Sequence, residues 1–227
     1  VLYEQSAHVP RYPASITKIL TVALALENCA LDEEITMSVD AVFSVDRSST
    51  HIALTDGEVI TVEQAAYATM VQSANDAANG LAEHAGGTID HFVEMMNEKA
   101  AEIGALDSHF TNANGLPDED HYTSAYDMAL ITKYALTVPD FSTFFSAYEY
   151  TMAPTNKQPE ERHLGTDHMM FVTSQYTYEG AWGGKLGWTS DAGHTGVTVA
   201  KRGDRELICV VLKSDGMYDK FKDMTKL

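Results

Sequence analysis

Basic residues are scarce in this chain. Its 227 residues carry 15 lysines and arginines against 33 aspartates and glutamates, a formal net charge of −18. Proteins that bind nucleic acid neutralise phosphates with basic patches, and anionic membrane surfaces attract the same side chains. The sequence has no basic cluster beyond Lys201 and Arg202. The composition therefore argues against a nucleic-acid partner and against an anionic membrane surface.

Cysteines and metal-binding motifs are also scarce. The two cysteines, Cys29 and Cys209, fall inside apolar segments, where a thiol more often packs as a small hydrophobe than forms a disulfide. Neither C-x-x-C nor H-E-x-x-H occurs in the sequence, so we expect no structural or catalytic zinc site.

Long apolar runs and a leader are missing too. The longest apolar run has about a dozen residues, against the roughly 20 that a membrane-spanning helix needs. The first residues, Val1–Glu4, read as a strand already under way rather than as a secretion signal. Two alternatives stay open: a cytosolic protein, or one whose leader has been removed. The length suits one sizeable domain or two small ones.

What the sequence does contain is a serine and a lysine placed before a buried helix. The run from Ile19 to Leu26 is apolar nearly all round, as in a helix at the centre of a domain, and Pro13 suits the start of that helix. Ser15 and Lys18 would then share one face, one turn apart. Burial lowers a lysine pKa, and a neutral amine can take the proton of a serine hydroxyl. The pair can therefore act as nucleophile and base, although S-x-x-K alone is more often a helix cap followed by a solvated lysine.

The remaining pattern predicts an α+β protein. Residues 62–72 begin with a capping box formed by Thr61 and Gln64. Residues 32–50 read as short strands and loops, and residues 137–180 as loops. We expect an antiparallel sheet, made of N- and C-terminal strands and flanked by helices. The further helices are expected over residues 77–85, 88–104, 124–135 and 218–227, and the strands over residues 1–5, 180–190, 194–200 and 206–213.

Two polar elements follow Ser15 and Lys18 along the chain. The triplet Ser73-Ala74-Asn75 lies between two predicted helices, where a turn is the simplest explanation because serine and asparagine compete with helical hydrogen bonds. A functional reading is a hydroxyl that relays a proton and an amide that binds a substrate carbonyl. The second element, Lys185-Leu186-Gly187, lies in a glycine-rich strand that another backbone can approach closely.

Taken in order, S-x-x-K, S-x-N and K-x-G resemble the signature of penicillin-binding proteins and class A β-lactamases, S-x-x-K, S-D-N and K-T-G. The chain resembles the serine D-alanyl-D-alanine carboxypeptidases among the low-molecular-weight penicillin-binding proteins. The likeness extends over essentially all 227 residues, including Asn114–Pro117 with His121, and Asp191–His194. It implies one β-lactamase/transpeptidase-like catalytic domain over residues 1–227, an α/β/α sandwich with an all-helical subdomain.

The resemblance implies a role for each catalytic residue. Ser15 would be acylated by the penultimate D-alanine carbonyl, and water would then hydrolyse the acyl-enzyme. Lys18 would be the base, and Ser73 would pass a proton to the leaving amine. No cofactor or metal is needed by this chemistry.

The binding residues follow from the same resemblance. Asn75 would hold the peptide, and Lys185 would attract its terminal carboxylate, with Leu186 and Gly187 beside it. The backbone N–H groups of Ser15 and Trp188 would form the oxyanion hole.

One position departs from the family pattern. Leu186 stands where the family has threonine, whose hydroxyl binds the carboxylate of the substrate or of a β-lactam. Losing a hydrogen bond to a charged group costs about 1.5–3 kcal/mol. We therefore expect weakened rather than abolished activity.

Three alternatives stay open. A serine β-lactamase needs a further carboxylate for deacylation, and no convincing Glu-x-x-x-Asn element lies between Asn75 and Lys185. A peptidoglycan-binding relative could have lost activity through Leu186. A cytosolic Ser-Lys hydrolase would share only the first motif.

The resemblance also implies partners and a location. The partners would be stem peptides ending in D-Ala-D-Ala and β-lactam antibiotics. The location would be extracytoplasmic, with leader and membrane anchor outside this chain.

Overall fold

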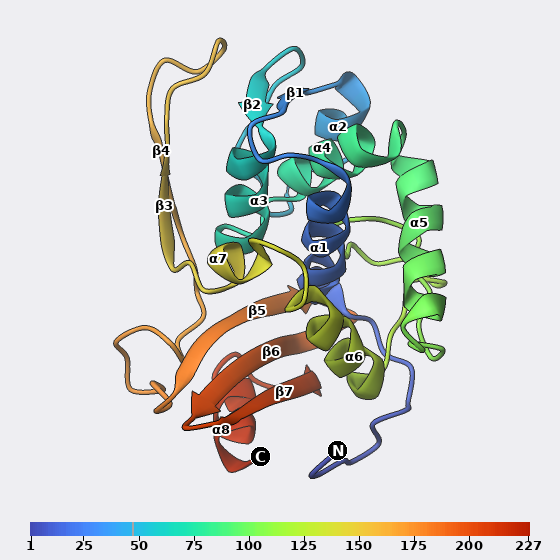
Figure 1. Ribbon diagram of the computed structural model, residues 1–227, viewed down its shortest axis with the longest axis vertical. Helices are drawn as coiled ribbons and strands as arrows, with labels where there is room; N and C mark the ends of the chain where they lie inside the picture. The colour runs from blue at the N-terminus through green and yellow to red at the C-terminus, as the bar shows by residue number, and fades with distance from the viewer. Residues whose placement is uncertain (47) are drawn as a thin grey trace.

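The computed structural model describes residues 1–46 and 48–227 (Figure 1). Seven strands and eight α-helices are assigned within these residues, and the 3₁₀ helix η1, Ala14–Thr17, precedes α1. No helix in the described ranges is both long and apolar enough to cross a membrane. The α-helices are α1 Lys18–Asn28, α2 Val39–Phe43, α3 Val62–Val71, α4 Asn75–Gly86, α5 Ile89–Glu102, α6 Ala125–Ala135, α7 Phe141–Phe145 and α8 Asp219–Lys226. The strands are β1 Glu34–Thr36, β2 Val59–Thr61, β3 Glu149–Met152, β4 Arg162–Gly165, β5 Ala181–Thr189, β6 Gly193–Arg202 and β7 Arg205–Ser214.

Helix α1 is the centre of the molecule, as its sequence predicts. Eight consecutive residues, from Lys18 to Ala25, are buried, and helices α3, α4, α5, α6 and α7 all contact α1. A helix that is apolar all round can be satisfied only by neighbours on every side. In Figure 1 these helices gather above and around the sheet, with α1 rising from it. This arrangement places Ser15 and Lys18 where the helical part meets the sheet.

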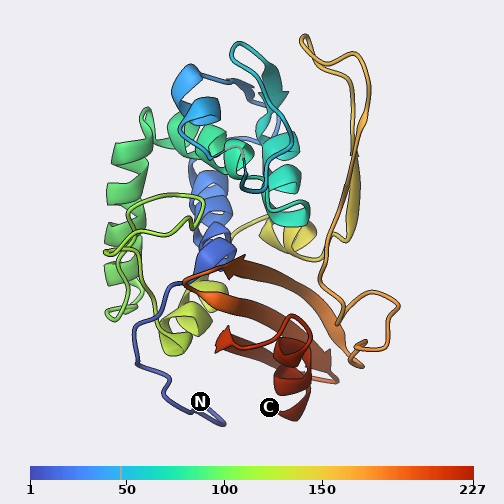
Figure 2. The same cartoon turned by 180° about the vertical axis from the view of Figure 1, so that it is seen from behind.

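The main sheet is antiparallel, in the order β5-β6-β7. Its register pairs Lys185 with Val197 and Trp188 with His194. One face contacts η1, α6 and α7, and the other contacts α8, as the two opposite views show (Figures 1 and 2). The α/β/α layering therefore confirms the expected fold class. It also leaves β5 at the edge of the sheet, with part of its backbone free to face a ligand.

Most predicted elements are found. The capping box at the start of α3 is complete: Gln64 N–H donates to Thr61 Oγ1 at 3.1 Å, and Thr61 N–H donates to Gln64 Oε1 at 2.9 Å. Ser124 caps α6 and accepts from the backbone N–H of Asp127. Strands β5, β6 and β7 and helix α8 also agree with the expected ranges to within a few residues.

The strand expected over residues 1–5 is wrong. Val1–Glu4 are exposed without regular structure, and the first bridge of the chain joins Arg11 to Thr123. The main sheet consists of C-terminal strands alone. A short apolar segment becomes a strand only where an edge pairs with it, and three apolar residues cannot specify that partner.

Residues 32–50, predicted as short strands and loops, contain strand β1 but also a helix, and residues 137–180, predicted as loops, contain regular structure. Residues 32–50 include the short helix α2, whose N-cap Ser38 accepts from Ala41 N–H at 3.0 Å. Residues 137–180 include α7 and the β3–β4 hairpin. In that hairpin Tyr150 stacks on Tyr67 of α3 with ring centroids 4.0 Å apart. Such a contact between distant segments is invisible to a local pattern.

Candidate active site

Ser15 and Lys18 meet as their spacing predicts. Ser15 lies in the 3₁₀ turn η1, capped by Pro13, and Lys18 is the first residue of α1. The distance from Lys18 Nζ to Ser15 Oγ is 2.9 Å. Lys18 has no exposed surface at all, whereas Ser15 is half-buried. A reachable hydroxyl beside a fully buried amine is the arrangement that a lysine-activated nucleophile requires.

Two further oxygen atoms hold the Lys18 amine in place. Nζ donates to Asn75 Oδ1 at 2.6 Å and to the backbone carbonyl of Asn114 at 2.5 Å. Burial lowers the pKa of Lys18 well below its usual value, and the charge of Lys185 lowers it further, while Asp76 acts in the opposite direction. The structure therefore favours the neutral amine, the form that can accept a proton.

Ser73 and Lys185 form a second hydroxyl–amine pair. Ser73 lies between α3 and α4 with φ of 62°, a left-handed conformation that is uncommon and strained for serine. Its Oγ accepts a hydrogen bond from Lys185 Nζ at 2.9 Å, and Nζ also donates to the carbonyl of Leu186 at 2.9 Å. The pair joins the α3–α4 junction to strand β5 across 112 positions of sequence.

A second buried lysine acts on Lys185. Burial lowers the pKa of Lys185 to about 7, and the charge of Lys220 on α8 contributes to the lowering, while Asp167 opposes it. Lys220 is itself buried, which lowers its own pKa. Lys220 could not be recognised from the sequence, because a lysine in an amphipathic helix normally faces solvent. Two buried amines, one on β5 and one on α8, therefore influence each other's charge.

Glycines let β5 come close to Ser15. A Cβ atom added at Gly187 would lie 2.8 Å from the backbone nitrogen of Ser15, which is closer than a side chain can approach. Gly115, with φ of +87°, would overlap the carbonyl of Ala14 if it carried a Cβ atom. Both contacts require glycine. They bring β5 and the Asn114 loop against the turn that carries the nucleophile.

Leu186 and Trp188 occupy the other face of β5. Leu186 packs against a small apolar cluster of Met170, Phe221 and Met224 beneath the sheet. Trp188 is 61% exposed, and its ring centroid lies 6.2 Å from that of His194. Leu186 therefore has a packing role in this fold that its place in the K-x-G motif does not reveal.

Buried hydrogen bonds hold the loops around Lys18. Asp76 accepts from the backbone N–H groups of Ile52 and Leu54 at 3.2 and 3.0 Å, and Asn75 Nδ2 donates to Ser49 Oγ at 3.0 Å. These contacts fix the segment before β2 to the start of α4. Among these residues, Ser49 was not anticipated from the sequence, since it lies in a serine-rich stretch that reads as a loop.

His121 fixes the Asn114 loop from the other side. Its Nδ1 accepts from Thr111 N–H at 3.0 Å, so Nε2 carries the proton and donates to Thr17 Oγ1 at 2.9 Å. Burial lowers the pKa of His121 to about 4. A neutral imidazole thus ties the loop to η1. The sequence does not predict that Asn114 holds the Lys18 amine, because Asn114 does so through its backbone carbonyl, a group that every residue has.

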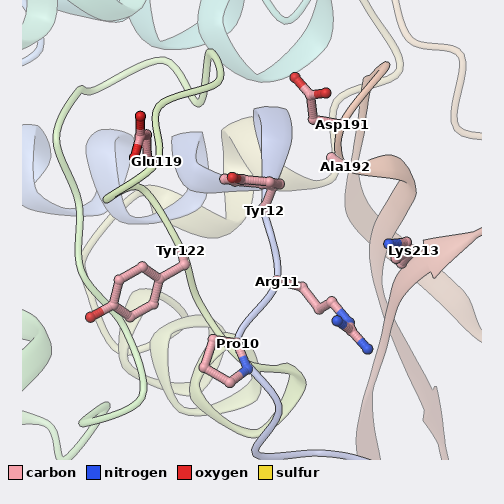
Figure 3. Close-up of a pocket in the computed structure, with 8 residues that line it drawn as sticks. All are labelled: Pro10, Arg11, Tyr12, Glu119, Tyr122, Asp191, Ala192 and Lys213. Carbon is pink, nitrogen blue, oxygen red and sulfur yellow. The ribbon is translucent and has the colours of Figure 1, made fainter.

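A pocket of about 270 Å³ opens beside the segment that leads into η1 (Figure 3). Glu119 and Tyr122 lie on the left of this view, and Asp191 and Lys213 lie on the right. None of the predicted catalytic residues lines it. The pocket therefore neighbours Ser15 without containing the Ser-Lys pair. Its lining residues are Pro10, Arg11, Tyr12, Glu119, Tyr122, Asp191, Ala192 and Lys213.

Comparison with known proteins gives a consistent picture. A family model described as D-alanyl-D-alanine carboxypeptidase matches residues 1–216. The chain is 32% identical over 232 residues to D-alanyl-D-alanine carboxypeptidase DacF of Bacillus subtilis, covering 100% of this chain and 57% of that protein. It is 30% identical over 237 residues to D-alanyl-D-alanine carboxypeptidase DacD of Escherichia coli, covering 100% of this chain and 58% of that protein. The chain thus spans a little over half the length of these relatives.

Solved structures agree. The DD-transpeptidase of Streptomyces K15 superposes with a TM-score of 0.89 at 27% identity, covering 99% of this chain and 89% of that chain. The D-alanyl-D-alanine carboxypeptidase DacD of Francisella tularensis gives a TM-score of 0.87 at 25% identity, covering 99% and 65%. The likeness therefore extends over nearly the whole of the present chain.

Proposed function

The chain belongs to the D-alanyl-D-alanine carboxypeptidase family, and on that premise we propose that residues 1–227 are a single catalytic domain that removes the terminal D-alanine from peptidoglycan stem peptides. The reaction proceeds through an acyl-enzyme on Ser15, and penicillins acylate the same oxygen. The observation that carries the proposal is the contact between Ser15 Oγ and the buried amine of Lys18 at 2.9 Å.

Acylation begins with proton transfer from Ser15 to Lys18. A neutral amine has two N–H donors and one lone pair. The carbonyl oxygens of Asn75 and Asn114 accept the two donors, so the lone pair is left for the Ser15 hydroxyl. Lys18 takes the proton as Ser15 Oγ attacks the carbonyl carbon of the penultimate D-alanine. Asn75 thus positions the base, besides its expected contact with the peptide.

The tetrahedral oxyanion needs backbone donors. Ser15 N–H lies beside Gly187 of β5. The Leu186 carbonyl accepts from Lys185 Nζ, and the same amine donates to Ser73 Oγ. Backbone groups two residues apart in a strand point the same way, so we expect Trp188 N–H to point to this side of β5. Together these two N–H groups supply the oxyanion hole.

Collapse of the intermediate requires a proton for the leaving amine. The proton taken by Lys18 passes through the Ser73 hydroxyl to the nitrogen of the departing D-alanine, as the C–N bond breaks. Lys185 donates to Ser73 Oγ, which orients that hydroxyl toward its acceptor. A water molecule then attacks the acyl carbon, Lys18 takes its proton, and release of the shortened peptide returns a proton to Ser15 Oγ.

The substrate carboxylate is attracted by Lys185, the buried amine on β5 that also donates to Ser73. The hydroxyl expected in the family motif is missing at Leu186, so this attraction is mainly electrostatic. We assign the protein to the extracytoplasmic side, where peptidoglycan stem peptides and β-lactams are found. The relatives and solved structures described above are D-alanyl-D-alanine carboxypeptidases and a DD-transpeptidase, which does not favour the β-lactamase alternative.

The test combines a labelled penicillin with a stem-peptide mimic ending in D-Ala-D-Ala. Peptide mapping is expected to find the penicillin adduct on Ser15, and Ser15→Ala is expected to abolish both the adduct and D-alanine release. Slow loss of the adduct distinguishes this activity from that of a β-lactamase. An adduct elsewhere, or D-alanine release that survives Ser15→Ala, would contradict the proposal.

A further inference from the structure

Three side chains of metal-binding type converge far from the Ser-Lys pair. Cys29 is the C-cap residue of α1, Glu33 lies in the turn before β1, and His84 is in the last turn of α4. One ligand atom from each, the thiol sulfur, a carboxylate oxygen and an imidazole nitrogen, lies within 4.8 Å of both others. The thiol and the imidazole are half-buried, and Glu33 is exposed.

From this geometry we propose that Cys29, Glu33 and His84 bind a zinc ion. Thiolate, imidazole and carboxylate are the donors that zinc takes in proteins, at about 2.0–2.3 Å and in tetrahedral geometry. Ligand atoms around such an ion lie about 3.5 Å apart. The present separations, of up to 4.8 Å, therefore need to change by about 1.3 Å at most, and the exposed side leaves a fourth position for water.

The carboxylate is already oriented toward the cluster. Glu33 Oε1 accepts from Ala30 N–H at 2.7 Å, and Oε2 lies 2.9 Å from His84 Nε2. The turn is tied to the start of α3, because Glu63 N–H donates to the carbonyl of Leu31 at 3.0 Å. On zinc binding the Glu33–His84 contact is replaced by two bonds to the ion, and the thiol proton leaves to solvent.

The cluster lies where a bound ion would stabilise the packing of helix α1 against helix α4. Helices α1 and α4 touch at their first residues, where Lys18 Nζ donates to Asn75 Oδ1. Their C-terminal ends carry Cys29 and His84, and Figure 1 shows α1 rising from the sheet toward β1. A metal ion there would hold together the C-terminal ends of α1 and α4, whose first residues, Lys18 and Asn75, belong to the candidate active site. The sequence motifs missed it, because its ligands come from separate elements.

Zinc binding is measured by competition with a chromophoric chelator, and Co²⁺ serves as the spectroscopic probe. We expect one zinc per chain and a thiolate-to-cobalt charge-transfer band. Cys29→Ala should remove the band and weaken zinc binding about 100-fold or more. His84→Ala should weaken zinc binding by a similar factor. Cys209→Ala is the matched control, since Cys209 is the other half-buried free thiol, and it should bind like the wild type.

Alkylation of the folded wild type gives an independent readout. Zinc is expected to protect Cys29 from a thiol reagent and to leave Cys209 unaffected, and to raise the melting temperature of the wild type but not of Cys29→Ser. Far-UV circular dichroism verifies that each variant is folded. Absence of zinc binding, binding that survives Cys29→Ala, or equal protection of both cysteines would overturn the proposal. None of these readouts depends on the proposed peptidase activity.

Discussion

Replacing Leu186 by threonine should increase acylation. The hydroxyl would restore a hydrogen bond to the carboxylate of the substrate or of a penicillin. Such a bond to a charged group contributes about 1.5–3 kcal/mol, and about 1.4 kcal/mol corresponds to a factor of ten. The expected gain is therefore about 10- to 100-fold in the second-order rate of acylation.

The structure adds an opposing effect on stability. Leu186 packs against the cluster of Met170, Phe221 and Met224, and its Cδ2 atom covers Gly196. In the protein without substrate, shortening the side chain by one methylene costs about 0.8 kcal/mol, and a hydroxyl that has no carboxylate to bind costs about 1–3 kcal/mol more beside that cluster. Leu186→Thr should therefore acylate faster and melt at a lower temperature.

Valine is the matched control, because it has the shape of threonine without the hydroxyl. Acylation by a fluorescent penicillin and D-alanine release are measured for the wild type, Leu186→Thr and Leu186→Val, together with their melting temperatures. We expect Leu186→Val to acylate like the wild type. If threonine and valine acylate at the same rate, residue 186 does not bind the carboxylate, and the reasoning fails.

Three further predictions concern buried polar groups. Lys18→Met should slow acylation by about 10²–10⁴-fold and lower the free energy of unfolding, because two buried carbonyl oxygens lose their donor; acylation at the wild-type rate would contradict the assigned base. Burial lowers the pKa values of His121 and His168 to about 4 and about 3. Below pH 6.5 the unfolded chain binds protons that the folded chain does not, so urea unfolding should show stability falling between pH 7 and 5, by up to about 1.4 kcal/mol per pH unit for each histidine. Equal stability at both pH values would refute this. Asp76→Ala leaves two buried loop amides without an acceptor and should cost about 2 kcal/mol or more in denaturant unfolding; an unchanged midpoint would show that the loop is held otherwise.

The sequence determined the features that depend on local pattern. The apolar run after Lys18 can be satisfied only at the centre of a domain, and α1 lies there. The capping box of Thr61 and Gln64 fixes the start of α3 within four residues. Ser15 in η1 and Lys18 at the start of α1 are one helical turn apart, so their contact follows from local helical geometry. The three ordered motifs pointed to the family to which the chain belongs.

The tertiary structure alone decided the contacts between distant segments. The Asn114 carbonyl that holds Lys18 lies 96 positions away, and any residue could supply it. Three further features depend on how the helices and the sheet are placed. They are the packing of Leu186, the effect of the charge of Lys220 on Lys185, and the convergence of Cys29 with His84. The prediction of a strand at residues 1–5 was wrong for the same reason, since a strand forms only when another strand pairs with it. Periodicity and caps act within a few residues, whereas hydrogen-bond partners and buried charges are selected by the folded chain as a whole.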